Sequence, residues 1–459
     1  YDIFTDALPP VRTGAPGGSE HDRARGSSTG GGGGDGNGVV GSEEGRAAAG
    51  LLQTGALTPA SVAGGKHSSR PSVIYLPPLT GTELQGKLNK KPSTPRWWCR
   101  RRTSSWFRLW ATLESLLPWE FPCFADNLRL TPGDGNSGAV PPLGVEVRLG
   151  PTLEPPQGNP RIVGLLQPWS TVADALRRRG WTDDLLDTHA YDWRLSPAEW
   201  SAPGGSFQSL RAAISSRVAA SGGRRVVLLG LSLGASYAVS FLNSKVVDQE
   251  WKETHMERLV TLSGVWSGTP RSTWDVISGR LQGLEAVLDG AAVRQLLRGI
   301  PALAWTFPAP PPGATPGDPG GPVVITNTAL GRDYSTAQLG QALRDAGAPE
   351  TSAFWEAALP FALASPPNVS THCFYSYGLR TAVHVTYARA DFSDTSPMVR
   401  YDDGDLTVPH ASLVACRGWA VRQVASVRSH SFFGVVHGML TSLPEALEDI
   451  LDAIAGEAG

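Results

Sequence analysis

The sequence predicts an α/β fold built around a parallel sheet, and three observations support this prediction. A continuous apolar run beginning at Val226 has the length of a buried strand. The run leads directly into the turn Gly230-Leu231-Ser232-Leu233-Gly234, and an apolar stretch with a helical pattern follows at once. Similar strand-length runs precede and follow this unit, at 73–76 and 258–262. Strands that alternate with helices in this way favour a sheet covered by helices.

The serine turn predicts a nucleophile. Glycines flank Ser232 because the turn is too tight for larger side chains, and the serine then stands above the sheet at the positive end of the next helix. The same Gly-x-Ser-x-Gly pattern also occurs at 26–30, in a low-complexity tract without strand or helix patterns. The prediction therefore depends on the strand and helix around Ser232, and the pattern alone would not support it.

Length, composition and charge set limits on the fold and its partners. The 459 residues accommodate one large domain with insertions, or about two to three ordinary domains. A hydrophobic fraction of 41% suffices for a core, while 53 glycines and 37 prolines indicate much irregular chain. The net charge of −2 gives no indication of a nucleic-acid partner. No apolar run reaches the length of about 18 residues that a membrane span needs. No signal peptide precedes the first strand, so we expect any targeting segment to be absent or already removed.

The chain divides into two parts of different character. Residues 1–70 are rich in Gly, Ser and Ala with almost no aromatic residues, so we predict a mostly disordered segment. Residues 71–459 are predicted to form an α/β-hydrolase domain. Its first strand breaks into Pro77-Pro78-Leu79-Thr80-Gly81, at the place where the second half of an oxyanion hole lies in such domains. The Pro- and Gly-rich stretch 308–322 predicts a mobile surface loop.

A dense cluster of tryptophans lies beside a basic run within 97–123. Its apolar residues from 106 to 117 have helical spacing. One interpretation is a helix packed on the core in a small satellite layer. The other is an interfacial element whose Trp and Leu side chains enter a lipid surface while arginines meet phosphates. Composition leaves both open.

The four cysteines bear on the cellular compartment. Two sequence-local disulfides, Cys99–Cys123 and Cys373–Cys416, are the simplest of three possible pairings, and four buried thiols in a reduced protein are the alternative. None of the four lies at zinc-ligand spacing from histidines. The glycosylation sequon Asn368-Val369-Ser370 favours a secretory route.

A nucleophilic serine needs a histidine base and a buried carboxylate that orients the imidazole. In α/β-hydrolases these follow the serine in the order Asp, His, each after a late strand. The acidic turn 400–409 supplies Asp405, with Asp402 and Asp403 as neighbouring candidates. His437 lies in an apolar loop just before the last helix, whereas His410 and His430 are interpreted as surface residues.

The chain resembles the lecithin:cholesterol acyltransferase family, which includes lysosomal phospholipase A and phospholipid:diacylglycerol acyltransferases. The matching stretches are Leu84-Gln85-Gly86-Lys87-Leu88, Trp106-Phe107-Arg108-Leu109-Trp110, Asp126-Asn127-Leu128-Arg129-Leu130, Tyr191-Asp192-Trp193-Arg194, Asp403-Gly404-Asp405-Leu406-Thr407-Val408 and the His437 loop. The Asp192–Arg194 pair is expected to be structural. Pro77-Pro78-Leu79 departs from the family's usual Pro-Gly-x, a change that we expect to stiffen the oxyanion loop.

The resemblance assigns roles to individual residues. It implies Ser232 as nucleophile, Asp405 as carboxylate and His437 as base, with the backbone N–H groups of Leu79 and Leu233 as the oxyanion hole. It also implies both disulfides, Cys99–Cys123 and Cys373–Cys416. The loop closed by the first would be a lipid-docking lid carrying Trp97, Trp98, Trp106 and Trp110.

The implied function is a lipid O-acyltransferase or phospholipase A. Ser232 would take an acyl chain from a glycerophospholipid and pass it to water or to a lipid alcohol such as a sterol. The alternatives are a phospholipase that uses only water, and a catalytically inactive lipid-binding homologue. We expect no cofactor and no metal. The expected partners are a phospholipid membrane or lipoprotein surface and a lipid acceptor, without nucleic acid. The expected location is the secretory pathway, either secreted or in the lumen of a lysosome- or vacuole-like compartment.

Overall fold

The computed structural model describes residues 70–110, 112, 114–133, 138–152, 168–280, 288–311, 313, 314, 317, 319–363, 365–394 and 396–456. The predicted disordered segment 1–70 thus lies outside the described residues, except for Arg70. Residues Ser68–Gly459 form one compact unit. In the predicted loop 308–322, the described residues form no helix or strand.

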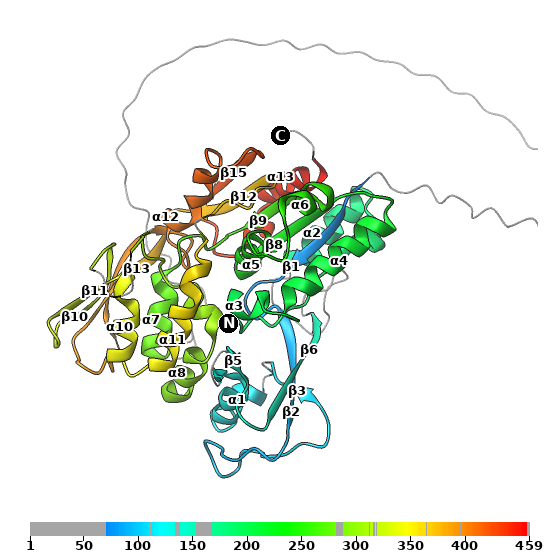
Figure 1. The fold of residues 1–459 in the computed structure, drawn as a ribbon. Coiled ribbons are helices and arrows are strands. Elements are labelled where there is room, and N and C mark those ends of the chain that lie inside the picture. The colour runs from blue at the N-terminus through cyan, green and yellow to red at the C-terminus, as the bar shows by residue number, and fades with distance from the viewer. Residues whose placement is uncertain are drawn as a thin grey trace, which may run out of the picture. The chain divides into compact units, whose positions relative to one another are not determined.

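A six-stranded parallel sheet forms the centre of this unit, in the order β15-β12-β9-β8-β1-β7 (Figure 1). Every neighbouring pair of its strands is parallel. The strands are β1 (Ser72–Leu76), β7 (Leu186–Thr188), β8 (Val226–Leu231), β9 (Met256–Leu262), β12 (Thr371–Tyr377) and β15 (Val427–Phe433). Strand β8, which leads to Ser232, is buried along its whole length near the middle of the sheet.

Helices cover both faces of the sheet, because alternate strand residues point to opposite sides. Val227 and Leu229 pack with α2 (Pro168–Arg178) and α13 (Pro444–Ala455) on one face. Leu228 packs with α4 (Ser206–Ala220), α5 (Leu233–Leu242) and α6 (Gln249–His255) on the other. This three-layer arrangement is the predicted α/β-hydrolase fold.

An accessory region follows β1. Its antiparallel sheet has the order β3-β2-β6, made by β2 (Thr82–Leu88), β3 (Phe107–Arg108) and β6 (Val145–Thr152). The remaining elements are the 3₁₀ turn Glu114–Leu116, α1 (Phe121–Leu128), β4 (Thr131–Pro132) and β5 (Ala139–Val140). The helical spacing read over 106–117 is thus misleading, because Phe107 pairs with Gly86 of β2 and the α-helix begins only at Phe121.

A larger insertion separates β9 from β12 and continues to β15. Its helices are α7 (Pro270–Ser278), α8 (Gly290–Arg298), α9 (Pro301–Trp305), α10 (Leu339–Asp345), α11 (Pro349–Ala358) and α12 (His410–Leu413). Its sheet, in the order β11-β10-β13-β14, contains β10 (Val323–Asn327), β11 (Arg332–Ser335), β13 (Leu379–Tyr387) and β14 (Met398–Gly404). Strand β14 runs directly into the loop that carries Asp405.

The remaining elements are short. They comprise α3 (Pro197–Ser201) and the 3₁₀ turns Asp183–Leu185, Thr336–Gln338, Leu359–Phe361, Val414–Trp419 and Leu440–Ser442. Among the described helices, none combines the length and apolar character needed to cross a bilayer.

Candidate active site

The turn between β8 and α5 holds Ser232 in a strained conformation. Its backbone angles, φ of 53° and ψ of −118°, lie outside the regions that residues other than glycine favour. The flanking glycines are required by close backbone contacts. A Cβ on Gly230 would lie 2.7 Å from the Ala235 Cα, and one on Gly234 would lie 2.1 Å from the Leu76 carbonyl oxygen. The backbone geometry is that of a nucleophile elbow.

Ser232, His437 and Asp405 form one hydrogen-bonded chain. His437 Nε2 lies 2.9 Å from Ser232 Oγ, and His437 Nδ1 lies 2.7 Å from Asp405 Oδ2. The His437 backbone N–H also donates to the Asp405 carbonyl oxygen at 2.9 Å. Ser232 follows β8 and His437 follows β15, both strands of the parallel sheet, and Asp405 follows β14. Because each residue lies just beyond the carboxyl end of its strand, the three can meet despite their separation in sequence.

The loop around Asp405 satisfies the rest of its buried carboxylate. Oδ1 accepts hydrogen bonds from the N–H groups of Thr407 and Val408, at 3.1 and 2.7 Å. The Leu406 N–H donates to Thr381 Oγ1 of β13 at 2.9 Å, and Leu406 has a φ of 76°. Hydrogen bonds to both carboxylate oxygens fix the direction of this side chain toward His437. Thr381 was not identified from the sequence, because nothing near it in the chain indicates this contact.

The other side chains that the sequence offered as the catalytic carboxylate or base have different partners. Asp403 pairs with His410 at 3.2 Å. Asp402 accepts a hydrogen bond from the Asp403 N–H. His430 lies 3.2 Å from His372, on the neighbouring strand of the central sheet.

Leu79 and Leu233 both lie beside the elbow. Leu233 is the first residue of α5. Leu79 lies in the turn after β1, where the Gly81 N–H donates to the Pro78 carbonyl and Thr80 has a φ of 72°. The contacts of Gly234 show that this turn approaches α5 closely.

An apolar cavity lies one helical turn along α5 from Ser232. Ser236 is on its wall, and most of the remaining lining is aromatic or aliphatic: Val265, Trp266, Trp305, Phe307, Trp355 and Leu363. Among the described residues, no group of three His, Cys, Asp or Glu side chains is arranged to hold a metal ion.

The four predicted lid tryptophans have different environments. Trp97 is 91% exposed and Trp98 is 43% exposed. Trp106 is half-buried beneath the Arg148 guanidinium, and Trp110 packs edge-on against Trp193 with ring centroids 5.0 Å apart. Trp110 is therefore not part of an exposed lid, since its ring packs on the core.

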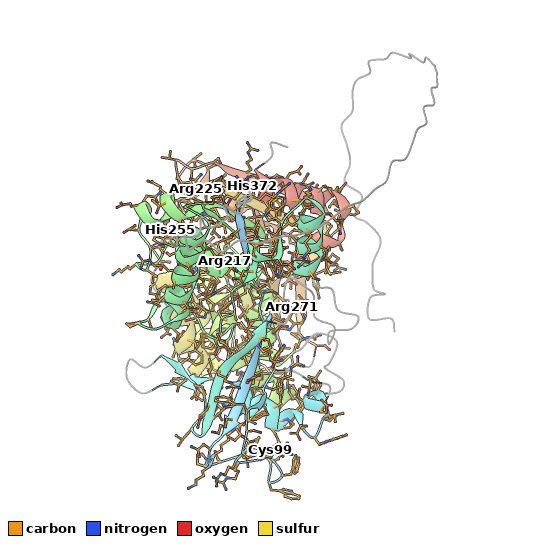
Figure 2. The ribbon with its side chains drawn as sticks, turned by 90° about the vertical axis from the view of Figure 1, so that its right-hand side faces the viewer. Cys99, Arg217, Arg225, His255, Arg271 and His372 are labelled. Carbon is orange, nitrogen blue, oxygen red and sulfur yellow. A yellow bond between two sulfur atoms is a disulfide. The ribbon has the colours of Figure 1, made fainter. Side chains whose placement is uncertain are left out.

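Two further apolar side chains of the accessory region are exposed. Trp119 is 60% exposed, and its carbonyl accepts a hydrogen bond from the Trp98 indole. Leu143 is 79% exposed and lies just before β6. Figure 2 shows Cys99, beside Trp98, at the opposite end of the described unit from Arg225 and His372 of the central sheet.

The two cysteine pairs differ. Cys99 and Cys123 form a disulfide, with Cα atoms 5.4 Å apart. Cys373 in β12 and Cys416 are buried free thiols, so the predicted second disulfide is not formed. Burial and the neighbouring Cys416 thiol raise the pKa of Cys373 well above its usual range. The two thiols are neighbours in the fold, but closeness alone does not determine whether they are oxidised to a disulfide.

The Tyr191-Asp192-Trp193-Arg194 stretch forms the expected ion pair. The buried Arg194 guanidinium lies 2.7 Å from Asp192 Oδ2 and also donates to the Leu128 carbonyl oxygen.

Comparisons with known proteins show what this chain is similar to in sequence and fold. A family model described as lecithin:cholesterol acyltransferase matches residues 106–333. The lysosomal phospholipase A and acyltransferase of Bos taurus is 30% identical over 380 residues, which cover 80% of this chain and 88% of that protein. The phosphatidylcholine-sterol acyltransferase of Oryctolagus cuniculus is 28% identical over 397 residues, covering 85% and 86% respectively. Among solved structures, the crystal structure of the Tle4–Tli4 complex is similar in fold, with a TM-score of 0.50 and 11% identity, covering 84% of this chain and 98% of that one.

Proposed function

Because the chain belongs to the lecithin:cholesterol acyltransferase family, we propose that it takes acyl chains from glycerophospholipids through an acyl-enzyme on Ser232. The observation on which this proposal depends is the hydrogen-bonded chain from Ser232 through His437 to Asp405. A serine held in this way is activated by the adjacent base, and the buried carboxylate stabilises the imidazolium that forms.

In the first half-reaction, Ser232 Oγ attacks the ester carbonyl carbon while its proton passes to His437 Nε2. The oxyanion would accept hydrogen bonds from the Leu233 and Leu79 N–H groups. When the tetrahedral intermediate collapses, the bond to the lysophospholipid oxygen breaks, and His437 gives its proton to that oxygen. The acyl chain remains on Ser232.

In the second half-reaction, a hydroxyl group replaces the lysophospholipid. Water or a lipid alcohol gives its proton to His437 and attacks the acyl carbonyl, and the proton then returns to Ser232 Oγ.

We propose that the exposed tryptophans next to the Cys99–Cys123 disulfide dock on a phospholipid or lipoprotein surface. Trp97 and Trp98 lie beside the arginine run 100–102, a combination suited to a lipid interface. The formed disulfide and the exposed sequon residue Asn368 support a secretory route, ending outside the cell or in an organelle lumen.

Substitutions of the proposed catalytic residues test the reaction. Ser232→Ala should abolish labelling by a fluorophosphonate, because the nucleophile is removed. Asp405→Asn should retain the fold and lower kcat by about 10⁴-fold. Asp403→Asn is the matched control, since Asp403 pairs with His410, and its effect should be much milder. Near-normal turnover in a folded Asp405→Asn enzyme would contradict the assignment.

The acceptor is tested by product analysis. Liposomes containing labelled phospholipid and sterol should yield steryl ester together with free fatty acid if a lipid alcohol is used. Fatty acid alone would identify a phospholipase. Neither product, with an unlabelled Ser232, would identify an inactive lipid-binding homologue.

A further inference from the structure

The turn after β1 contains two consecutive prolines and therefore lacks backbone donors at its start. Pro77 and Pro78 have no N–H, so this part of the turn can be held only through its carbonyl oxygens. The Pro78 carbonyl accepts a hydrogen bond from Gly81 within the turn itself. The Pro77 carbonyl is bound from outside, by the hydroxyl group of Tyr191 at 2.7 Å.

Tyr191 is fully buried and contacts the nucleophile helix as well. Its ring stacks on Tyr237 of α5, with centroids 4.2 Å apart and an interplanar angle of 25°. Burial raises the pKa of Tyr191 well above its usual range, so the phenol keeps the proton that it donates. One side chain thus touches both structures that are proposed to supply oxyanion donors.

The segment that carries Tyr191 also holds the far end of the turn. The Trp193 indole N–H donates to the Thr82 carbonyl at 2.9 Å. The Tyr191 N–H donates to Thr82 Oγ1 at 3.4 Å. The segment is itself anchored, because the buried Arg194 binds Asp192 and the Leu128 carbonyl. The turn from Pro77 to Thr82 is therefore fixed at both ends by one rigid element.

We propose that Tyr191 is a positioning residue for the oxyanion hole, whose hydroxyl holds the Pro77 turn at the distance from α5 at which the Leu79 and Leu233 N–H groups reach the same oxygen. This inference rests on the proposed function. Tyr191 does not touch the reacting atoms. It acts through the position of Leu79, so its loss should weaken binding of the tetrahedral state more than binding of the substrate.

The test compares two tyrosine-to-phenylalanine variants. Tyr191→Phe removes only the hydroxyl that binds Pro77. Tyr237→Phe is the matched control, because this equally buried tyrosine donates instead to Ser206 Oγ of α4, at 3.0 Å. The full chain is assayed with a soluble short-chain ester. Active sites are counted by end-point fluorophosphonate titration, so that unfolded protein does not affect the rates.

Tyr191→Phe should lower kcat by about 10-fold and leave KM within about twofold. The fall is smaller than the 10² to 10³ caused by deleting an oxyanion donor, because the donor is loosened and not removed. The affinity for a short-chain trifluoromethyl ketone, which forms a tetrahedral adduct with the serine, should fall by about the same factor. Tyr237→Phe should change all three quantities by less than about twofold.

Equal kcat and equal ketone affinity in the two variants would overturn the inference. So would a loss confined to the number of active sites, which would show a role in folding alone. Failure of the proposed function is separately visible, because wild-type enzyme would then not be labelled by the fluorophosphonate, or Ser232→Ala would keep its turnover.

Discussion

The stacked pair His372–His430 predicts that the protein loses stability in acid. His372 is buried in β12, and its Nδ1 lies 3.2 Å from Nε2 of His430 in β15 (Figure 2 labels His372). Burial lowers the pKa of His372 to about 4, and the nearby charges of His430, Arg258 and Arg428 act in the same direction. Burial also lowers the pKa of His430, and the negative charge of Asp449 in α13 opposes this shift with a smaller effect.

The direction of the effect follows from the two protonation states. The folded pKa of His372 lies below the value of about 6.5 expected in the unfolded chain. As the pH falls, the unfolded chain therefore binds the proton first. The stability that depends on neutral His372 is fully present above pH of about 6.5, and is lost progressively as the pH falls toward 4.

Proton linkage with these two pKa values removes about 2 kcal/mol of unfolding free energy between pH 7.5 and 5.0. Solvent reaches the half-buried His430 side of the pair, so we expect a measured loss of about 1 to 2 kcal/mol from His372. His372→Gln cannot take up this proton. Its unfolding free energy should therefore fall less than that of the wild type over the same pH range, by that amount.

Urea unfolding followed by tryptophan fluorescence measures the difference at pH 7.5 and 5.0. Measurements at pH 7.5 and 8.5 provide an internal control, because the imidazole is neutral in both states there and the two proteins should change in parallel. An equal loss of stability in wild type and variant at pH 5.0 would refute the reasoning.

Three further predictions concern the elbow, the disulfide and the lipid surface. Gly234→Ala should abolish activity, since its Cβ would lie 2.1 Å from a carbonyl oxygen, whereas Gly290→Ala has open space and should be tolerated; esterase assays of both variants decide this. Replacing Cys99 and Cys123 by serine should reduce stability by about 3 kcal/mol, as the bridge spans 24 residues; unchanged thermal unfolding would argue against it. Trp97→Ala should weaken binding to vesicles, measured by sedimentation, while sparing hydrolysis of a soluble ester, and an equal loss of both would contradict an interfacial role for this exposed tryptophan.

The sequence predicted the elbow well because its determinants are local. A buried strand, two glycines that permit close contacts and an apolar helix all lie within a short stretch around Ser232. Features of this kind depend on near neighbours in the chain, which a single sequence shows directly.

Features that depend on distant contacts were not predictable in the same way. The spacing of Trp106 and Trp110 suggests one helical face, yet the chain there pairs with β2, and Trp110 packs on Trp193. The four-stranded sheet joins strands from both sides of β12, and no local pattern reports such pairing. The role of Thr381 beneath the Asp405 loop is hidden for the same reason.

The hydrogen bond between Ser232 and His437 joins residues 205 positions apart. During synthesis the elbow emerges long before β15 and the loop that follows it. Under the proposed assignment, a nascent chain therefore carries a serine without its base while the larger insertion after β9 and the last strands are still being made. Lipid-cleaving activity would arise only when the loop that carries His437 packs beside Ser232. An incomplete or arrested chain therefore cannot attack the membranes of the compartment in which it folds.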